Sequence, residues 1–513
     1  MFRSHNPLKY SKILEMNRKK LLLLILTFFF MAVVSYFYYL QSVSYSFVDE
    51  FDNIVAAHFM IQGKTLFASI FHNRQIGPVY ISYFLQQILQ PSTLYQLILY
   101  HRLFIVAISF AMSILIVWRF GLVGMLTVFM FETIKLSSFG NFFQAEAMIV
   151  YPALYLFGLM MEGFEKKKMN SLDLIIAGVF AWFILFSREA YTPLVLFMLL
   201  MIFLRTRSKK LKILLAGISI ILSVVTLATV SLKDYIFQII YVNSQNKLLQ
   251  GEFNLLKSFF YPVYIFFPTG SLTYTRIVEL LFASVFVTLV LVRKKWKEAL
   301  LIMVALGLAV LRTIPPGSDL YPAYKMLVWY VLFFYAVFHP ATIEGKNKYF
   351  RYIYYCVLTT AFAYAVLASN LFHPIDRARE FNIAYNRYTL NGEVINALAA
   401  PEDTLFVDGY DSLLYWSVRA TPSFKYAMYY PILEGIQPFE KERLAMFHSN
   451  PPTFYYRDCI SKNALSLPHF VRSEYKNFKQ NKSSTCLYVH KDKLPMNENQ
   501  EKELKDKFGY HLD

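Results

Sequence analysis

The chain has 513 residues, of which 56% are hydrophobic, 18% aromatic and only 17% charged, and its formal net charge is +17. Soluble globular proteins carry about 25% charged residues, so this composition excludes most soluble classes and favours a polytopic α-helical membrane protein. Lys and Arg fall in short clusters between apolar runs, a pattern that fixes membrane topology and disfavours nucleic-acid binding. The cysteines lack metal-ligand spacing, so no zinc site is predicted.

The apolar run 21–40 follows basic residues 18–20 and has no signal-peptide cleavage site behind it. We interpret it as the first transmembrane helix, with the N-terminus in the cytoplasm. Because a membrane helix needs roughly 20 predominantly apolar residues, the sequence predicts about eleven helices in all. The further candidates lie near 97–118, 120–137, 145–162, 171–187, 190–205, 212–231, 276–292, 298–313, 323–339 and 352–370. Alternation then places the basic clusters 166–168, 205–212, 293–297 and 346–351 inside the cytoplasm.

Three predicted outer segments are too long or too polar to be simple turns: 41–96, 231–275 and the tail after about 371. Long loops in compact proteins are usually functional, so the site is expected there. We therefore predict a transmembrane catalytic domain over 1–370, whose outer loop 41–96 carries the site, and a soluble extracytoplasmic domain over 371–513. In the outer loop, an amphipathic helix over 47–60 and an apolar piece over 78–89, too short to cross, are expected along the outer membrane face.

The tail is richer in charge and alternates strand-like with helical runs, which predicts a small α/β domain. The expected strands are 404–407, 453–456 and 486–490, and the expected helices are 412–419 and 439–448. Outside the cytoplasm, Cys459 and Cys486 could form a disulfide, and two free thiols are the alternative. Asp408 and Asp411 lie near the start of a helical run and are interpreted as helix-capping residues.

An acid pair, Asp49 and Glu50, follows the first membrane helix, with Asp52 close by. One interpretation is that these acids cap a surface helix and complement its dipole. The other is a general base at the membrane surface, because a carboxylate whose pKa is raised by burial or by a neighbouring acid can take a proton from an attacking hydroxyl. Spacing alone leaves both open.

The run Phe47-Val48-Asp49-Glu50-Phe51-Asp52-Asn53, followed by Gln62-Gly63-Lys64-Thr65-Leu66-Phe67 and by Phe71-His72-Asn73-Arg74-Gln75-Ile76-Gly77-Pro78, resembles the first outer loop of the GT-C membrane glycosyltransferases. The closest branch is the bacterial one related to protein O-mannosyltransferases and to the aminoarabinose transferase of lipid A. Residues 74–78 stand where that family has a His-Pro-Pro element, which leaves the acceptor open. Helix count, an inside N-terminus and an outer C-terminal domain also fit the family.

This resemblance implies transfer of a hexose or pentose from a polyprenyl-phosphate donor to a protein, lipid or glycan acceptor on the outer face of the cytoplasmic membrane, with inversion. Asp49 then matches the family's proposed base, and Glu50 would orient it or the acceptor. Because the leaving group is a lipid phosphate, the site also needs cations near the bilayer surface.

Cations at the predicted outer helix ends suit the phosphate, although each taken alone could simply snorkel to the interface. The phosphate candidates are Arg188, Arg312 and Lys325. Glu146 matches a position near the donor sugar in the family, with an interhelical hydrogen bond as the alternative. The other candidate substrate contacts are His72, Arg74, Tyr321 and Tyr324, while His58 is expected to pack within its helix. For His72 and Arg74 the alternative is a solvated pair in the loop.

Two other functions remain as alternatives. A transporter or flippase for lipid-linked sugars would use the acids to couple protons or bind cargo, but such proteins usually show internal repeats and broken helices, which this sequence lacks. An oligosaccharide polymerase would place its arginines in large outer loops between helices. Asp49, Glu50 and Glu146 could hold a divalent cation, yet no ligand set demands one, so no cofactor is predicted.

Overall fold

The computed structural model describes residues 7–164, 169–245, 296–311, 323–341, 348–373, 375–457, 473–480, 483–494, 496 and 498–512. The chain divides into two compact units, each built from three segments. Unit 1 comprises Met1–Ser42, Arg102–Ser223 and Glu252–Ile375, and unit 2 comprises Val43–His101, Val224–Gly251 and Asp376–Asp513. The outer loop that the sequence assigns to the transmembrane domain thus shares a compact unit with the C-terminal tail.

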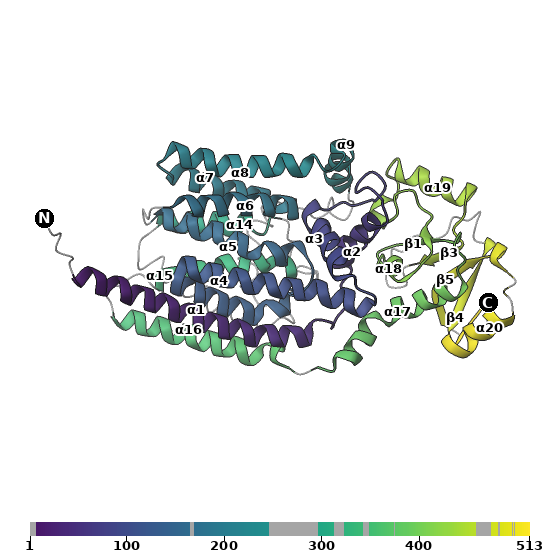
Figure 1. Ribbon diagram of the computed structural model, residues 1–513, viewed down its shortest axis with the longest axis horizontal. Helices are drawn as coiled ribbons and strands as arrows, with labels where there is room; N and C mark the ends of the chain where they lie inside the picture. The colour runs from purple at the N-terminus through teal and green to yellow at the C-terminus, as the bar shows by residue number, and fades with distance from the viewer. Residues whose placement is uncertain are drawn as a thin grey trace. The chain divides into compact units, whose positions relative to one another are not determined.

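Unit 1 is helical, and its long helices lie side by side (Figure 1). Its elements are α1 (Pro7–Gln41), most of α4 (Leu94–Ile134), η1 (Lys135–Ser138), α5 (Ala145–Phe164), α6 (Ser171–Ser187), η2 (Glu189–Tyr191), α7 (Thr192–Arg205), most of α8 (Lys209–Leu227), α14 (Trp296–Leu308), η4 (Ala323–Met326), α15 (Leu327–Ala341), α16 (Lys348–Ala368) and η5 (Asn370–Phe372). The core helix is α5, which packs against α6, α7 and α15 and whose apolar window is fully buried.

In the part of the chain that the structure describes, four helices are long and apolar enough to cross a membrane. They are Arg18–Gln41, Leu94–Ser138, Ala145–Gly163 and Lys209–Leu227. The predicted count of about eleven is therefore not reached. The predicted spans at 171–187, 190–205, 298–313 and 323–339 form helices of 17, 14, 13 and 15 residues, shorter than the roughly 20 residues that a span needs. The predicted span 276–292 lies outside the described residues.

The helix α4 covers both predicted spans 97–118 and 120–137 because it folds back on itself at Gly121, whose φ of 60° and ψ of −133° are not helical. Lys135 Nζ donates a hydrogen bond of 2.7 Å to Ser109 Oγ, although 26 residues separate the two. In a straight helix these residues would be about 39 Å apart. Glycine permits the positive φ without steric cost. The two predicted spans therefore exist as the arms of a helical hairpin.

The helix ends that the sequence places in the cytoplasm meet at one end of unit 1. Arg119 binds Asp173 at 2.6 Å and Glu162 at 2.5 Å, which joins the turn of α4 to the end of α5 and the start of α6. Arg205 donates to the carbonyl oxygen of Gly163 at 3.4 Å. The opposite helix ends also meet, since Gln41 donates to the carbonyl oxygen of His373 at 2.9 Å. The two arms of α4, α5 and α6 therefore run in alternating directions within unit 1.

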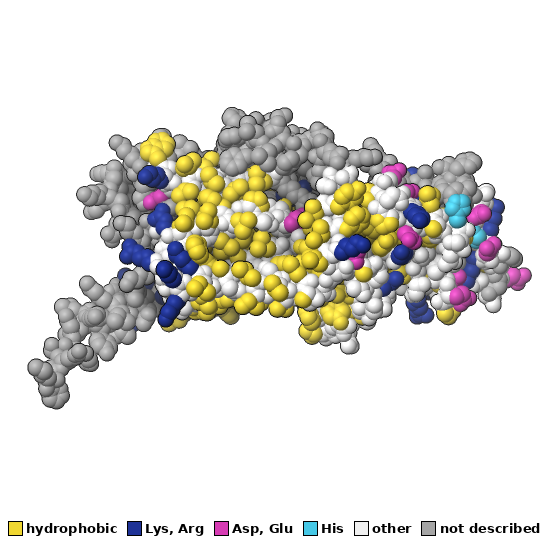
Figure 2. Space-filling model, turned by 90° about the horizontal axis from the view of Figure 1, so that it is seen from above, with side chains coloured by type: hydrophobic (Ala, Val, Ile, Leu, Met, Phe, Trp, Pro, Cys, Tyr) yellow, Lys and Arg dark blue, Asp and Glu magenta, His cyan; other side chains and the backbone are white. Residues whose placement is uncertain are grey.

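Large apolar side chains are exposed on the helices of unit 1, where an apolar solvent would cover them (Figure 2). On α1, α7 and α8 they include Leu21, Phe28, Phe29, Val33, Leu196, Leu200, Leu204, Ile213, Ile220 and Ile221. Helix length, composition and exposed surface together describe a helical, membrane-associated protein.

Unit 2 combines helices with a six-stranded sheet of order β2-β1-β3-β5-β4-β6. Its helices are α2 (Val48–Ile61), α3 (Ile76–Leu89), α9 (Leu232–Ile236), the π-helix η3 (Phe237–Val242), α17 (Arg377–Leu398), α18 (Leu414–Ser417), η6 (Pro431–Leu433), α19 (Phe439–Ser449), η8 (Lys491–Lys493), α20 (Glu498–Glu503) and η9 (Leu504–Phe508). Its strands are β1 (Thr404–Asp408), β2 (Thr421–Pro422), β3 (Phe454–Arg457), β4 (Tyr475–Gln480), β5 (Ser483–His490) and β6 (Tyr510–Leu512).

The sheet confirms the predicted small C-terminal domain of strands and helices. Strand β1 runs parallel to β2 and β3, and the remaining pairs are antiparallel. All three predicted strands and both predicted helical stretches are present, with α18 reduced to one turn. Cys486 is disulfide-bonded, Cys356 is free, and the predicted partner Cys459 lies outside the described residues.

The interpretation of Asp408 and Asp411 as helix caps is wrong. Asp408 accepts a hydrogen bond of 2.9 Å from Arg443, and Asp411 forms an ion pair of 2.9 Å with Arg387. Both carboxylates are buried, at 0% and 1% exposure. Because a buried carboxylate needs a charged or hydrogen-bonding partner, these arginines rather than free helix amides determine where the two acids lie.

Candidate functional site

The candidate site in unit 2 begins at the first turn of α2, shortly after α1 ends. Asp49 and Glu50 lie in this turn, and residue Phe47 at the N-cap makes no capping hydrogen bond with its side chain. The helix is buried rather than on the surface: Asp49 is 8% exposed and Glu50 is fully buried. The acids therefore complement the helix dipole, but they do not lie on the solvated helix that the capping interpretation assumed.

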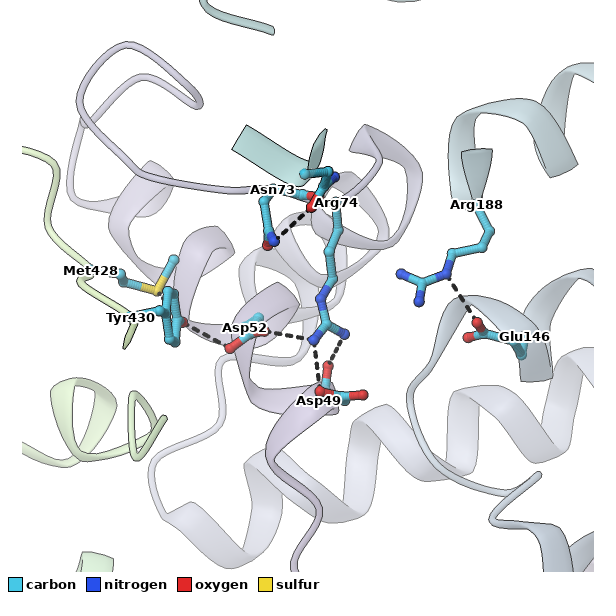
Figure 3. A network of polar contacts seen from close by, with 9 residues as sticks. Asp49, Asp52, Asn73, Arg74, Glu146, Arg188, Met428 and Tyr430 are labelled. Atoms are coloured by element: carbon cyan, nitrogen blue, oxygen red, sulfur yellow. Dashed lines mark hydrogen bonds and ion pairs between the residues drawn. The ribbon is translucent and has the colours of Figure 1, made fainter. Parts of the chain in front are cut away.

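Arg74 holds Asp49 and Asp52 together (Figure 3). One guanidinium nitrogen, Nη2, lies 2.7 Å from Asp49 Oδ1 and 3.0 Å from Asp52 Oδ2, and the other, Nη1, donates to the backbone oxygen of Asp49 at 2.9 Å. The two acids share one helical face because they are three residues apart. The planar guanidinium can serve both, which a lysine ammonium could do only as a point charge. The result is a buried pair of acids with one positive charge between them.

Asp52 has a second partner, because the hydroxyl of Tyr430 donates to its Oδ1 at 2.8 Å (Figure 3). Burial raises the pKa of Asp52 to about 6; the charge of Asp49 adds to this rise, whereas Arg74 and the Tyr430 hydroxyl oppose it. Tyr430 keeps its proton, since burial and the neighbouring Asp52 raise its own pKa well above the usual value. Asp52 therefore has a pKa closer to neutral pH than an ordinary aspartate.

Glu50 points to a different neighbour from Asp49. The hydroxyl of Tyr385, on α17, lies 3.5 Å from Glu50 Oε1 and donates to the backbone oxygen of Tyr45 at 3.0 Å. Adjacent helical residues are about 100° apart around the axis, so one of the pair faces Arg74 while the other faces α17. Asp49 and Glu50, predicted as a pair, thus bind different partners. The acid that shares Arg74 with Asp49 is Asp52.

The loop that carries Arg74 is held by the segment with α9 and η3. Gln238 accepts a hydrogen bond of 2.8 Å from the backbone amide of His72 and donates one of 2.5 Å to the backbone oxygen of Phe67. Asn243 and Asn73 exchange two further bonds, of 2.9 and 3.1 Å. The π-helical turn of η3 contains Gln238, in keeping with the frequent occurrence of such turns at functional sites.

The hydrogen bonds of Gln238 and Asn243 fix the loop that carries the two predicted substrate contacts His72 and Arg74. Arg74 is committed to the two carboxylates, and the His72 side chain is buried at 2% exposure. His58 packs as expected: its ring lies beside Phe59 and Trp416, and burial lowers its pKa to about 4.

In unit 1, three of the other predicted residues line one small cavity of about 20 Å³: Glu146, Arg188 and Lys325. Arg188 ends α6 in an extended conformation and forms an ion pair of 3.0 Å with Glu146, which opens α5 (Figure 3). Lys325 lies in η4, where its backbone oxygen accepts a hydrogen bond of 3.1 Å from Tyr191, another lining residue. Apolar side chains from Leu308 to Leu311 complete the described wall.

The lining combines two cations and one carboxylate with an apolar wall, the groups that would contact an anion attached to a hydrocarbon chain. Predicted contact Tyr324 is 2% exposed beside Lys325, whose ammonium lies 5.8 Å from its ring. The remaining candidates, Arg312 and Tyr321, lie outside the described residues.

Sequence reasoning assigned no role to Asp52, Tyr430 or Gln238. The three-residue spacing of Asp49 and Asp52 carries a signal, since it predicts a shared helical face. Tyr430 and Gln238 carry none, because they reach the acid pair and its loop from 378 and 166 residues away.

Across the described ranges, no group of three or more His, Cys, Asp or Glu side chains could hold a metal ion. No protein-family model matches the chain, and no curated protein is detectably similar to it.

Proposed function

We propose that this protein is an integral membrane glycosyltransferase. It transfers a sugar from a polyprenyl-phosphate donor to a protein, lipid or glycan acceptor at the outer face of the cytoplasmic membrane. The proposal includes an N-terminus in the cytoplasm and the sheet of unit 2 outside. The alternation of helix ends in unit 1 and the basic residues at the ends that meet around Arg119 support this orientation.

The observation that carries the proposal is the buried, arginine-held carboxylate of Asp49 directly after the first long apolar helix. In the reaction, the acceptor hydroxyl oxygen forms a bond to the anomeric carbon while the bond from that carbon to the phosphate oxygen breaks. The hydroxyl proton passes to Asp49, and the sugar configuration inverts because attack and departure occur on opposite faces. Arg74 keeps the Asp49 carboxylate ionised and fixes its orientation, while it lowers the basicity of that carboxylate.

The leaving group is a lipid phosphate, so negative charge develops on its oxygen as the bond breaks. We assign Arg188 and Lys325, with Arg312, to this phosphate, because cations aimed at developing charge stabilise a transition state. Glu146 orients Arg188 through their 3.0 Å ion pair. The apolar wall from Leu308 to Leu311 suits the first carbons of a polyprenyl chain.

The proposal is tested by release of polyprenyl phosphate from purified wild-type and Asp49→Asn protein. Both receive a panel of polyprenyl-phosphate hexoses and pentoses, with a crude envelope extract as the acceptor. The amide retains the shape of the carboxylate but cannot accept the proton, so turnover should fall by about 100- to 10,000-fold. The matched control is Asp492→Asn, since that side chain is 92% exposed and remote from the acid pair; it should retain wild-type turnover.

Turnover near the wild-type level in a folded Asp49→Asn variant would contradict the role of Asp49. Binding of a lipid-linked sugar by the wild-type protein with no release from any donor would instead favour a carrier of such lipids.

A further inference from the structure

The acids Asp49 and Asp52 of unit 2 have a further neighbour, Tyr430, from the C-terminal segment of that unit. Tyr430 lies 378 residues after Asp52 in the sequence, yet its hydroxyl donates to Asp52 Oδ1 at 2.8 Å. The ring of Tyr430 is fixed by two aromatic neighbours, with centroids 5.7 Å from Tyr410 and 5.8 Å from Phe71. Tyr430 is 4% exposed, so water does not compete freely for this hydrogen bond.

We infer that Tyr430 is a positioning residue that acts on Asp49 through Asp52. The Tyr430 hydroxyl keeps Asp52 ionised and bound to Arg74, so that the guanidinium is shared between the carboxylates of Asp49 and Asp52. The inference deepens the proposed function, on which it rests in treating Asp49 as the base. A guanidinium that served Asp49 alone would stabilise its charge more strongly and make it a weaker proton acceptor. The tail would thereby control the basicity of a residue in the first outer loop.

The groups that face Asp52 support this sharing. Arg74 contributes the positive charge, Asp49 a negative charge three residues earlier on α2, and Tyr430 and Ser412 contribute hydroxyls. Glu50, the other acid of the first turn, faces Tyr385. Burial raises the pKa of Asp52 to about 6, and the two hydroxyls and Arg74 pull it down. Above pH 6 Asp52 is ionised and Arg74 is shared; below pH 6 Asp52 takes up a proton and Arg74 is left to Asp49.

The test is a titration of purified full-length protein without donor or acceptor. Carboxyl stretching bands are followed by infrared difference spectroscopy in protein labelled with carbon-13 at the aspartate carboxyls. The wild type should show a band with a midpoint near pH 6 that Asp52→Asn abolishes. Tyr430→Phe should raise that midpoint by about one pH unit, because it removes a hydrogen bond to the ionised form. The control Tyr429→Phe removes the neighbouring hydroxyl, which bonds Glu440 instead, and should leave the midpoint unchanged.

The second readout is the pH profile of sugar transfer. Activity of Tyr430→Phe should be low near pH 6.5 and return toward the wild-type level above pH 8, where Asp52 is ionised in both proteins. A purely structural defect would lower activity at every pH. Thermal unfolding of both tyrosine variants shows whether they are folded.

Each outcome decides one claim. An unchanged Asp52 midpoint in folded Tyr430→Phe would overturn the inference even if the wild type transfers sugar. A raised midpoint in a protein that transfers no sugar would support the contact of Tyr430 with Asp52 and contradict the proposed function and, with it, the role of Asp49 as base.

Discussion

Arg74 binds two carboxylates that would otherwise repel each other in a buried place. Leaving either acid without a partner would cost several kcal/mol or force it to take up a proton. The prediction that Asp49 belongs to a site rests on the family resemblance, since the positions of the acids alone also fit a helix-capping role. The sequence did not predict which cation holds Asp49, since Arg74 is one of several polar residues in the same loop. The contact depends on the path of residues 67–74, which Gln238 determines from another segment.

Substitution of Arg188 should weaken binding of the donor. Arg188→Met should raise the KM for the lipid-linked donor by about 10- to 100-fold, because the variant loses a hydrogen-bonded charge to the phosphate. The KM of Arg188→Lys should lie between those of the wild type and Arg188→Met, since lysine keeps the charge but not the planar geometry. Initial rates at varied donor concentration measure the effect.

The matched control for this experiment is Arg207→Met, an exposed arginine beyond the end of α7, which should leave the KM unchanged. An unaltered donor KM in folded Arg188→Met would remove Arg188 from the phosphate site. Its ion pair with Glu146 would then be structural only.

Among the secondary structure elements, α4 shows what a hydropathy pattern can and cannot supply. The apolar runs 97–118 and 120–137 are strong signals, and both are helical. The predicted boundary between them, at residue 119, lies close to Gly121, where the backbone leaves the helical conformation. The helices α7, α14 and α15 are shorter than predicted because apolar composition continues through turns at which the backbone has already left the helix, whereas α6 has the predicted bounds.

The segment with α9 and η3 should stabilise the loop that carries Arg74. Gln238→Leu should lower the stability of unit 2 by about 2–4 kcal/mol, because the His72 amide and the Phe67 carbonyl lose their buried partner. The loop would then hold Arg74 less firmly, so sugar transfer should fall as well. Hydrogen exchange at the His72 amide reports the local opening directly.

The exposed Gln245, three residues beyond η3, provides the control variant Gln245→Leu, which should exchange like the wild type. Wild-type exchange at His72 in Gln238→Leu would show that Gln238 does not hold this loop.

For the whole molecule, the division into units follows spatial contacts rather than sequence order. Unit 2 takes one segment from near the N-terminus, one from the middle and one from the C-terminus. The sequence predicted each as a polar region outside the apolar runs, and it predicted the strands of the tail. It could not predict that the three form one compact unit, because contacts such as Tyr430 with Asp52 and Gln238 with His72 leave no local pattern.

This arrangement predicts the effect of a truncation. A chain ending after Ile375 lacks Tyr385 and Tyr430, which cover Glu50 and Asp52 in the full-length protein. Residues 43–101 should then be cleaved much faster by an added protease than they are in the full-length chain, because local opening exposes the backbone. Limited proteolysis of membrane vesicles, followed by mass spectrometry, measures the rate.

Cleavage within α5, which is buried in unit 1, serves as the internal control and should remain slow in both chains. Equal protection of residues 43–101 in the truncated and full-length chains would contradict a shared compact unit.

The distance in sequence between Asp52 and Tyr430 also has a consequence for biosynthesis. A ribosome that adds about 5–20 residues per second needs roughly 20–75 s to synthesise the 378 residues between them. In the proposed orientation, the first outer loop is exported early and waits for the tail with its acid pair incomplete. A polypeptide whose synthesis stops within this interval would carry Asp49 but not the tyrosine that completes its surroundings. Dependence of the base on Tyr430 would thus restrict activity to molecules that have been translated and exported at least as far as this residue.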